Sequence, residues 1–227
     1  GKRTENKLSG TAVLSYKATD DLLTYVSYSR GYKAGGFNMD RSALTRQEVP
    51  DDDTGLPIAG AICVSAATPG CAAAASTDDL EFKPETVDAF EVGAKYNGAW
   101  LGVNDALFHQ LFNNFQLNTF NGVNFIVENI NACSEDLDGA DSDNNPANGA
   151  CDDGDLRPGV RSRGVEFELF SRPIRDVNLN LGVTYPDVKY RADLVGADGV
   201  PLTNALFQLP GRRISNSSLW TVTSSLA

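Results

Sequence analysis

Apolar and polar residues alternate along most of this 227-residue chain, and this alternation constrains its fold more than any other feature. In the segment GVEFELF, Val165 and Phe167 would lie on one face of a strand, and Glu166 and Glu168 on the other. The same period of two recurs at 177–185. Successive side chains of a strand point to opposite faces, so each such segment predicts a strand with one apolar and one polar face. The sequence therefore predicts an all-β, antiparallel fold.

The connections between the predicted strands are alternately short and long. Short links occur at 19–21, 97–98 and 172–175, and the Asn-Gly pair among them favours a two-residue hairpin because both residues tolerate positive φ. The long links are the segments 38–84 and 132–158. We expect about seven strands in a meander, with tight turns at one end of the sheet and long loops at the other. The expected strands are 8–18, 22–37, 86–96, 99–119, 176–192 and 213–226, together with one pass made of 124–131 and 160–171 on either side of the second long segment.

The net charge of −11 is concentrated in the two long segments. Residues 38–84 contain eight acidic and three basic residues, and residues 132–158 contain eight acidic and one basic residue. The remaining sequence is nearly neutral. It has no basic stripe that would neutralise phosphates, so we expect no nucleic-acid partner.

All four cysteines lie inside the two acidic segments. Cys63 and Cys71 belong to the first, and Cys133 and Cys151 to the second. His109 is the single histidine, so a zinc site with two Cys and two His ligands cannot be completed. The local spacing favours two loop-closing disulfides, each worth about 2.5 to 3 kcal/mol, and therefore an oxidising compartment. Free thiols in the loops are the alternative.

Two classes of fold agree with this pattern. Short turns at one end and long loops at the other are typical of an outer-membrane β-barrel, whose apolar face contacts lipid and whose polar face lines the lumen. The alternative is a secreted or surface β-sandwich acting as a calcium-dependent binding or adhesion module, because one face of each sandwich sheet is also wet. No apolar run reaches the length of a membrane-spanning helix. In the barrel, the aromatic residues near the strand ends would form girdles at the membrane interfaces: Tyr16, Tyr25, Tyr28, Tyr32, Tyr96, Trp100 and Tyr185.

One strand resembles a known family. Residues 25–38 read YVSYSRGYKAGGFN and resemble a barrel strand of the TonB-dependent outer-membrane receptors, which ends in Gly-Tyr-Lys-x-Gly-Gly-Phe-Asn. Four further segments resemble later strands of that family in the same order: FKPETVDAFEVGAKYNG at 82–98, ALFHQLFNNFQL at 106–117, SRGVEFEL at 162–169 and LPGRRISNSSLWT at 209–221. In the last one, Ser217 and Ser218 stand where the family usually has Ala-Pro.

The resemblance implies that residues 1–227 form part of a transmembrane β-barrel of about 22 strands, with 38–84 and 132–158 as acidic extracellular loops and with no plug domain in this stretch. It also implies a location in the outer membrane of a Gram-negative bacterium, with lipopolysaccharide around the barrel. The expected activity is import of a small nutrient, a ferric siderophore or another iron complex, energised by TonB through the plug. We expect no enzyme, because no set of catalytic side chains can be assembled.

Arg30 and Lys33 are the candidate ligand-binding residues. They flank Gly31 at the outer end of the second expected strand, where they could face an anionic ligand. The alternative is that such rim bases pair with lipopolysaccharide phosphates or with the acidic loops.

The second acidic segment contains a candidate calcium site. Calcium prefers several hard oxygen ligands on a loop, and four aspartates are closely spaced around Gly139. The segment is not an EF-hand, because its glycine is misplaced and the final Glu is missing. A solvated acidic loop is the alternative, and no other cofactor is expected. The four aspartates are Asp136, Asp138, Asp141 and Asp143.

Overall fold

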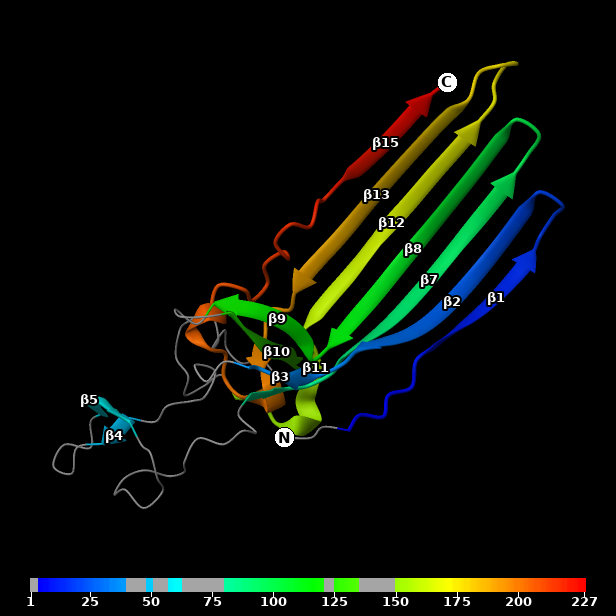
Figure 1. The fold of residues 1–227 in the computed structure, drawn as a ribbon. Helices are drawn as coiled ribbons and strands as arrows, with labels where there is room; N and C mark the ends of the chain where they lie inside the picture. Colours follow the sequence, from blue (N-terminus) through cyan, green and yellow to red (C-terminus); the bar gives the residue numbers. More distant parts are fainter. Residues whose placement is uncertain (1–3, 40–47, 51–56, 63–79, 121–124, 135–149) are drawn as a thin grey trace.

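A single seven-stranded antiparallel sheet, which we call the wall, dominates the computed structural model (Figure 1). The structure describes residues 4–39, 48–50, 57–62, 80–120, 125–134 and 150–227. The strands neighbour one another in chain order, which confirms the predicted all-β meander. They are β1 (Gly10–Lys17), β2 (Leu22–Lys33), β7 (Glu85–Asn97), β8 (Leu101–Asn113), β12 (Val160–Ser171), β13 (Leu179–Tyr190) and β15 (Thr221–Leu226).

Tight turns join the wall strands at one end, as the sequence predicts. Between β1 and β2, the hydroxyl oxygen of Thr19 accepts the backbone N–H groups of Asp21 and Leu22 at 3.3 and 3.1 Å. Between β7 and β8, the N–H of Gly98 donates to the carbonyl of Leu101 at 2.8 Å. The long connections therefore all lie at the opposite end of the wall, which we call the loop end (Figure 1).

At the loop end, part of the connections forms a second, smaller sheet, which we call the loop sheet. It consists of β9 (Phe115–Phe120), β10 (Phe125–Cys133), β11 (Leu156–Pro158) and β14 (Leu194–Gly196). The prediction that 124–131 and 160–171 form one pass is therefore wrong, because β10 pairs with β9, β11 and β14 and only β12 enters the wall. The strand expected at 99–119 also ends early. Asn114 adopts a φ of 48° and directs the chain into β9.

Short elements complete the connections. Two further strand pairs occur, β3 (Gly36–Phe37) with β6 (Glu81–Phe82), and β4 (Glu48–Pro50) with β5 (Pro57–Ile62). The helical turns are η4 (Asp153–Asp155), η5 (Ala197–Gly199) and η6 (Asn204–Leu206). Among the described residues, no helix has the length and apolar character needed to cross a membrane.

The main buried core lies at the loop end. Ile130 and Leu194 of the loop sheet are fully buried together with Val160 of the wall. Val160 is opposite Tyr190 and Phe112 in register, and all three belong to the polar face of the wall by alternation. The loop sheet therefore packs on the loop end of that face.

A disulfide joins the two ends of the second acidic segment. Cys133 ends β10 and bonds to Cys151, 18 residues later, which confirms one of the two predicted pairs. The N–H of Cys151 also donates to the carbonyl of Gly199, whose φ of 75° and close packing against Cys151 leave no room for a Cβ. Closing a loop of this length contributes about 3 kcal/mol in the chain-entropy model. Cys63 and Cys71 lie outside the described residues.

The two faces of the wall differ in polarity along every strand. On β13, Leu181 and Val183 lie on one face, and Asn180 and Thr184 on the other. The large exposed apolar side chains of the wall strands all lie on the apolar face, apart from Val13 and Phe170.

No layer of described residues covers this apolar face, where Leu14 is 73% exposed and Val222 is 62% exposed. A β-sandwich would bury these side chains between two sheets. The β-sandwich alternative is therefore wrong for this chain.

Aromatic side chains form two belts across the apolar face, one on the loop side of the strand midpoints and one at the turn end. On the loop side, Tyr28 packs at a tilt against Phe90 with ring centroids 5.0 Å apart, and Tyr185 against Trp220 at 4.6 Å. At the turn end lie Tyr16, Tyr96 and Trp100. Aromatic residues at two levels are typical of the two interfaces of a membrane. Tyr25 was expected among them, but alternation places it on the polar face.

A charge placed on the apolar face tests this assignment. Val183→Lys in the protein is expected to lower the free energy of unfolding in lipid vesicles by about 2 to 4 kcal/mol, because its ammonium would enter hydrocarbon. Thr184→Lys, one residue further on the polar face, is the matched control and is expected to cost less than about 1 kcal/mol. Denaturant titrations measure both values. Equal losses for the two variants would contradict the assignment.

Candidate functional site

The polar face of the wall carries a group of carboxylates midway along the strands. Glu91 comes from β7, and Glu166 and Glu168 come from β12; we call these three the acidic cluster. They line a shallow cleft of about 160 Å³ together with Tyr25 and Lys95. The side-chain period of two brings them to one face, although β8 separates their strands.

Hydrogen bonds fix two members of the acidic cluster. The hydroxyl of Tyr25 donates to Oε1 of Glu91 at 2.6 Å. The side-chain amide of Asn104, on β8, donates to Oε2 of Glu168 at 3.1 Å. Nζ of Lys95 lies 5.7 Å from the centroid of the Tyr25 ring, within cation–π range. The cleft therefore presents oriented carboxylates with one ammonium group beside them.

Glycines make room for the aromatic side chains of this face. A Cβ on Gly93 would lie 2.6 Å from Oη of Tyr25 and 2.6 Å from the carbonyl oxygen of Asp105. On β12, a Cβ on Gly164 would lie 2.6 Å from the ring of Phe108. Because neither glycine has a side chain, the rings of Tyr25 and Phe108 occupy that space. Gly93 is thus required for the position of the hydroxyl that holds Glu91.

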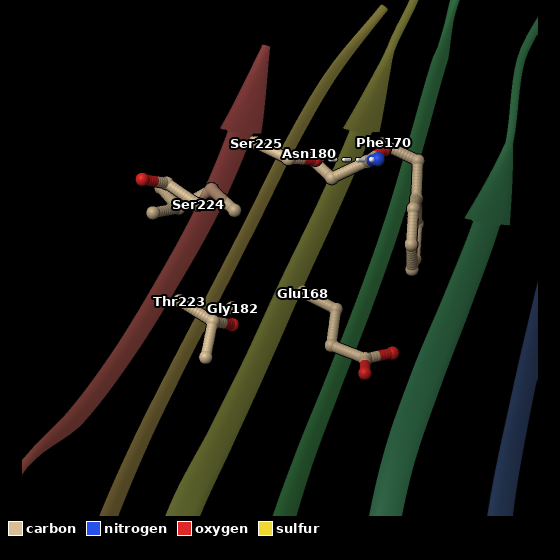
Figure 2. A pocket seen from close by; sticks show the side chains of 8 residues that line it. Glu168, Phe170, Asn180, Gly182, Thr223, Ser224 and Ser225 are labelled. Atoms are coloured by element: carbon tan, nitrogen blue, oxygen red, sulfur yellow. Dashed lines mark hydrogen bonds between the residues drawn. The ribbon is translucent and has the colours of Figure 1, made fainter. Parts of the chain in front are cut away.

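A second cleft, of about 200 Å³, lies beside the first on the polar face and crosses β12, β13 and β15 (Figure 2). Its lining includes Glu168, Asn180, Thr223 and Ser225. The side-chain amide of Asn180 donates to the hydroxyl of Ser225 at 3.1 Å, the bond drawn as a dashed line in Figure 2. Glu168 borders both clefts. The two clefts therefore adjoin on the polar face between β2 and β15, with Phe170 as an apolar part of the second cleft.

Buried amide side chains hold the connections at the loop end. The amide of Gln116 donates to the carbonyls of Ala34 and Lys83 at 2.8 and 3.0 Å. The amide of Asn129 donates to the carbonyls of Lys83 and Asn114 at 3.0 and 2.8 Å. Buried backbone groups need such partners where no regular ladder pairs them. These residues were not identified from the sequence, because Asn and Gln in a polar segment give no local sign of burial.

The two candidate ligand-binding residues do not meet. Arg30 lies on the apolar face, where its Nη1 is 3.6 Å from Oδ1 of Asp88. The hydroxyl of Tyr28 donates to the same carboxylate at 2.6 Å. Lys33 lies on the polar face at the end of β2, opposite Glu85. Of the pair, Lys33 alone lies on the face that carries the acidic cluster.

The candidate calcium ligands Asp136, Asp138, Asp141 and Asp143 lie outside the described residues. Within the described ranges, no group of three or more acidic, His or Cys side chains is placed to hold a metal ion. The calcium site stays a prediction that calorimetric titration of the protein with Ca²⁺ tests, and an absence of binding heat would contradict it.

Comparisons with known proteins agree with this architecture. The family model described as TonB dependent receptor-like, beta-barrel matches residues 1–225. The ferric yersiniabactin uptake receptor FyuA from Yersinia pestis is 16% identical, with a TM-score of 0.52, over 100% of this chain and 23% of that chain. The FrpB iron transporter from Neisseria meningitidis (F3-3 variant) is 12% identical, with a TM-score of 0.50, over 97% of this chain and 24% of that chain. No curated protein matches the chain.

Because the identities are low, these structures establish a likeness of fold alone. The chain spans about a quarter of the length of the two receptors. The activity of a whole receptor is therefore a matter of proposal.

The packing at Gly93 gives a test of the acidic cluster. Gly93→Ala in the full-length receptor is expected to displace Tyr25 and lower the free energy of unfolding by about 1 to 3 kcal/mol, because the added methyl overpacks the site. Gly102→Ala is the matched control on the same face, since the nearest atom to its Cβ is 3.5 Å away. Denaturant titration measures both variants. A Gly93 variant as stable as the Gly102 variant would refute the packing described.

Proposed function

Because the chain belongs to the β-barrel family of TonB-dependent receptors, we propose that it forms part of the wall of a receptor that imports a small nutrient by TonB-energised transport. The family places the barrel in the outer membrane of Gram-negative bacteria. The observation that carries the proposal is the wall itself, with an apolar face toward lipid, a polar face toward a lumen, and its long connections at one end.

The acidic cluster indicates what fills the lumen. Glu91, Glu166 and Glu168 face the lumen with Lys95 as the ammonium group of the cleft. Glu166 and Glu168 are exposed in this wall and Glu91 is half-buried, so a partner that covers them would have to supply positively charged or hydrogen-bonding groups. We expect an occupant with basic side chains, and the plug of the same receptor is the occupant that the family provides. TonB would act through that plug.

An iron complex, such as a ferric siderophore, is the cargo we propose. The names of the two structural relatives refer to ferric yersiniabactin uptake and to iron transport, respectively. The loop end, where the described connections are held by the disulfide and the buried amides, would form part of the entrance. Lys33 on the polar face is the candidate contact for an anionic complex.

Uptake measurements test the transport proposal. A strain that lacks the full-length receptor is expected to lose uptake of one or more radiolabelled ferric chelates, and the gene supplied in trans is expected to restore it. Uptake should also cease when TonB is absent, because the plug is moved by that protein. If this strain takes up every iron chelate normally but no longer takes up a nutrient without iron, the proposal that the cargo is an iron complex is wrong.

Neutralising the acidic cluster tests the role of the lumen. The double variant Glu91→Gln and Glu166→Gln keeps the shapes of both side chains and removes two charges. We expect it to reach the outer membrane and to lose at least about tenfold in TonB-dependent uptake, since one charge-assisted contact is worth about 1.5 to 3 kcal/mol. Asp20→Asn with Asp21→Asn removes the same charge at the β1–β2 turn and is expected to have no effect. Equal uptake by both double variants would contradict the role.

A further inference from the structure

Five basic residues gather on the outer side of the wall at the loop end. Arg161 and Arg163 come from β12, Lys189 from β13, and Arg191 and Arg213 from the connection that follows it; we call these five the basic cluster. Arg161 is opposite Lys189 in register, and Lys189 forms an isolated bridge with Arg213. Alternation places Arg161, Arg163 and Lys189 on the apolar face, on the side away from the acidic cluster.

Asp187 provides only partial charge compensation in the basic cluster. Its carboxylate, with a side chain 10% exposed, lies 3.6 Å from Nε of Arg163, 3.2 Å from Nζ of Lys189 and 3.8 Å from Nη1 of Arg213. One carboxylate is thus shared by three cationic side chains. The cluster keeps a net positive charge in a chain whose overall charge is −11.

Arg161 has an unmet hydrogen-bonding need. Its Nε–H is buried and has no hydrogen-bond partner among the residues that the structure describes. Arg161 borders a cavity of about 320 Å³ that is also lined by Lys189, Tyr190, Arg191 and Asp193. A buried donor without an acceptor is unfavourable, and more so when the group is charged. An acceptor that enters this cavity would meet the Arg161 guanidinium group, and a shift of that side chain would bring its Nε–H to the acceptor.

The basic cluster lies next to the aromatic belt on the loop side. Along β13, Lys189 and Asp187 precede Tyr185, which stacks on Trp220, when the strand is followed toward the turns. Beyond Tyr185 the same face continues with Val183 and Leu181. Aromatic belts lie at the headgroup level of a bilayer. The cluster is therefore at the height where lipid phosphates end and water begins.

We propose that the basic cluster binds a phosphate group of an outer-leaflet lipid, with the cavity beside Arg161 as the phosphate position. Arginine presents several N–H donors in a planar fork that fits phosphate oxygens, and lysine adds a point charge. The acyl chains of such a lipid would follow the apolar side chains below, such as Val165. The inference rests on the proposed membrane orientation of the wall, and it assigns a lipid role to residues separate from the transport surface.

The test uses the full-length receptor in detergent, and native mass spectrometry counts the lipids that it retains. The probes are bisphosphorylated lipid A, the same lipid after enzymatic dephosphorylation, and inorganic phosphate. We expect Arg161→Gln with Lys189→Gln to bind bisphosphorylated lipid A at least about tenfold more weakly than the unmodified receptor. Lys17→Gln with Arg175→Gln removes the same charge at the turn end and is expected to bind like the unmodified receptor. The dephosphorylated lipid and inorganic phosphate are both expected to bind weakly.

Three results would overturn the inference: unchanged lipid A binding by the double variant, equal weakening in the turn-end control, or inorganic phosphate binding as tightly as lipid A. Heat-dependent gel mobility checks that each barrel is folded. If the double variant does not fold, Arg191→Gln replaces it, because this exposed residue lies beyond β13 and is expected to weaken lipid A binding about threefold. Uptake of ferric chelates by the same variants is expected to be unchanged. Loss of lipid binding and loss of transport are therefore separate results.

Discussion

A single antiparallel sheet pairs its backbone groups only with neighbouring strands, and this constraint shapes the rest of the structure. The inner strands of the wall, β2 to β13, pair their N–H and C=O groups sideways with neighbouring strands, so neither face needs a second layer of protein for hydrogen bonding. Most apolar side chains then stay unburied, as in β1, where every residue is exposed. Such a sheet is unfavourable in water and favourable between hydrocarbon and an enclosed polar space, because each face meets a matching environment. The membrane replaces the missing core.

The loop end is stabilised in a different way, by the means that water-soluble proteins use. Ile130 and Leu194 are fully buried, amide side chains satisfy the irregular backbone, and the Cys133–Cys151 disulfide closes a long connection. This contrast follows from position, because connections outside the bilayer are surrounded by water and must bury their own apolar surface. The wall strands contribute to this core through Val160 and Tyr190, where they rise to the loop sheet. Strands such as β12 and β13 therefore have one part that faces the membrane and another part that contributes to the buried core.

The sequence predicts the wall well because its signal is local. Alternation assigns Leu181 and Asn180 to opposite faces, and the turn residues mark three hairpins, so strand order follows from chain order. The loop sheet was predicted only in part. Strands β9 and β10 overlap the expected strands 99–119 and 124–131, but the pairing of β10 with β14 joins residues far apart in the chain and leaves no periodic trace. The basic cluster could not be predicted in full for the same reason. Arg161 and Arg163 can be placed on one face from sequence, but their meeting with Lys189 depends on register between strands.

Strand β12 shows how tightly register and function are linked. Its outward residues include Arg161 and Arg163 near the loop end, and its inward residues include Glu166 and Glu168 further along. A slip of one residue would put the carboxylates into lipid and the guanidinium groups into the lumen. Gly164, between the two sets, opposes such a slip, because any side chain there would meet the carbonyl of Tyr185 at 2.2 Å and the ring of Phe108. Gly164 thus helps to keep the basic and the acidic residues of β12 on opposite faces of the wall.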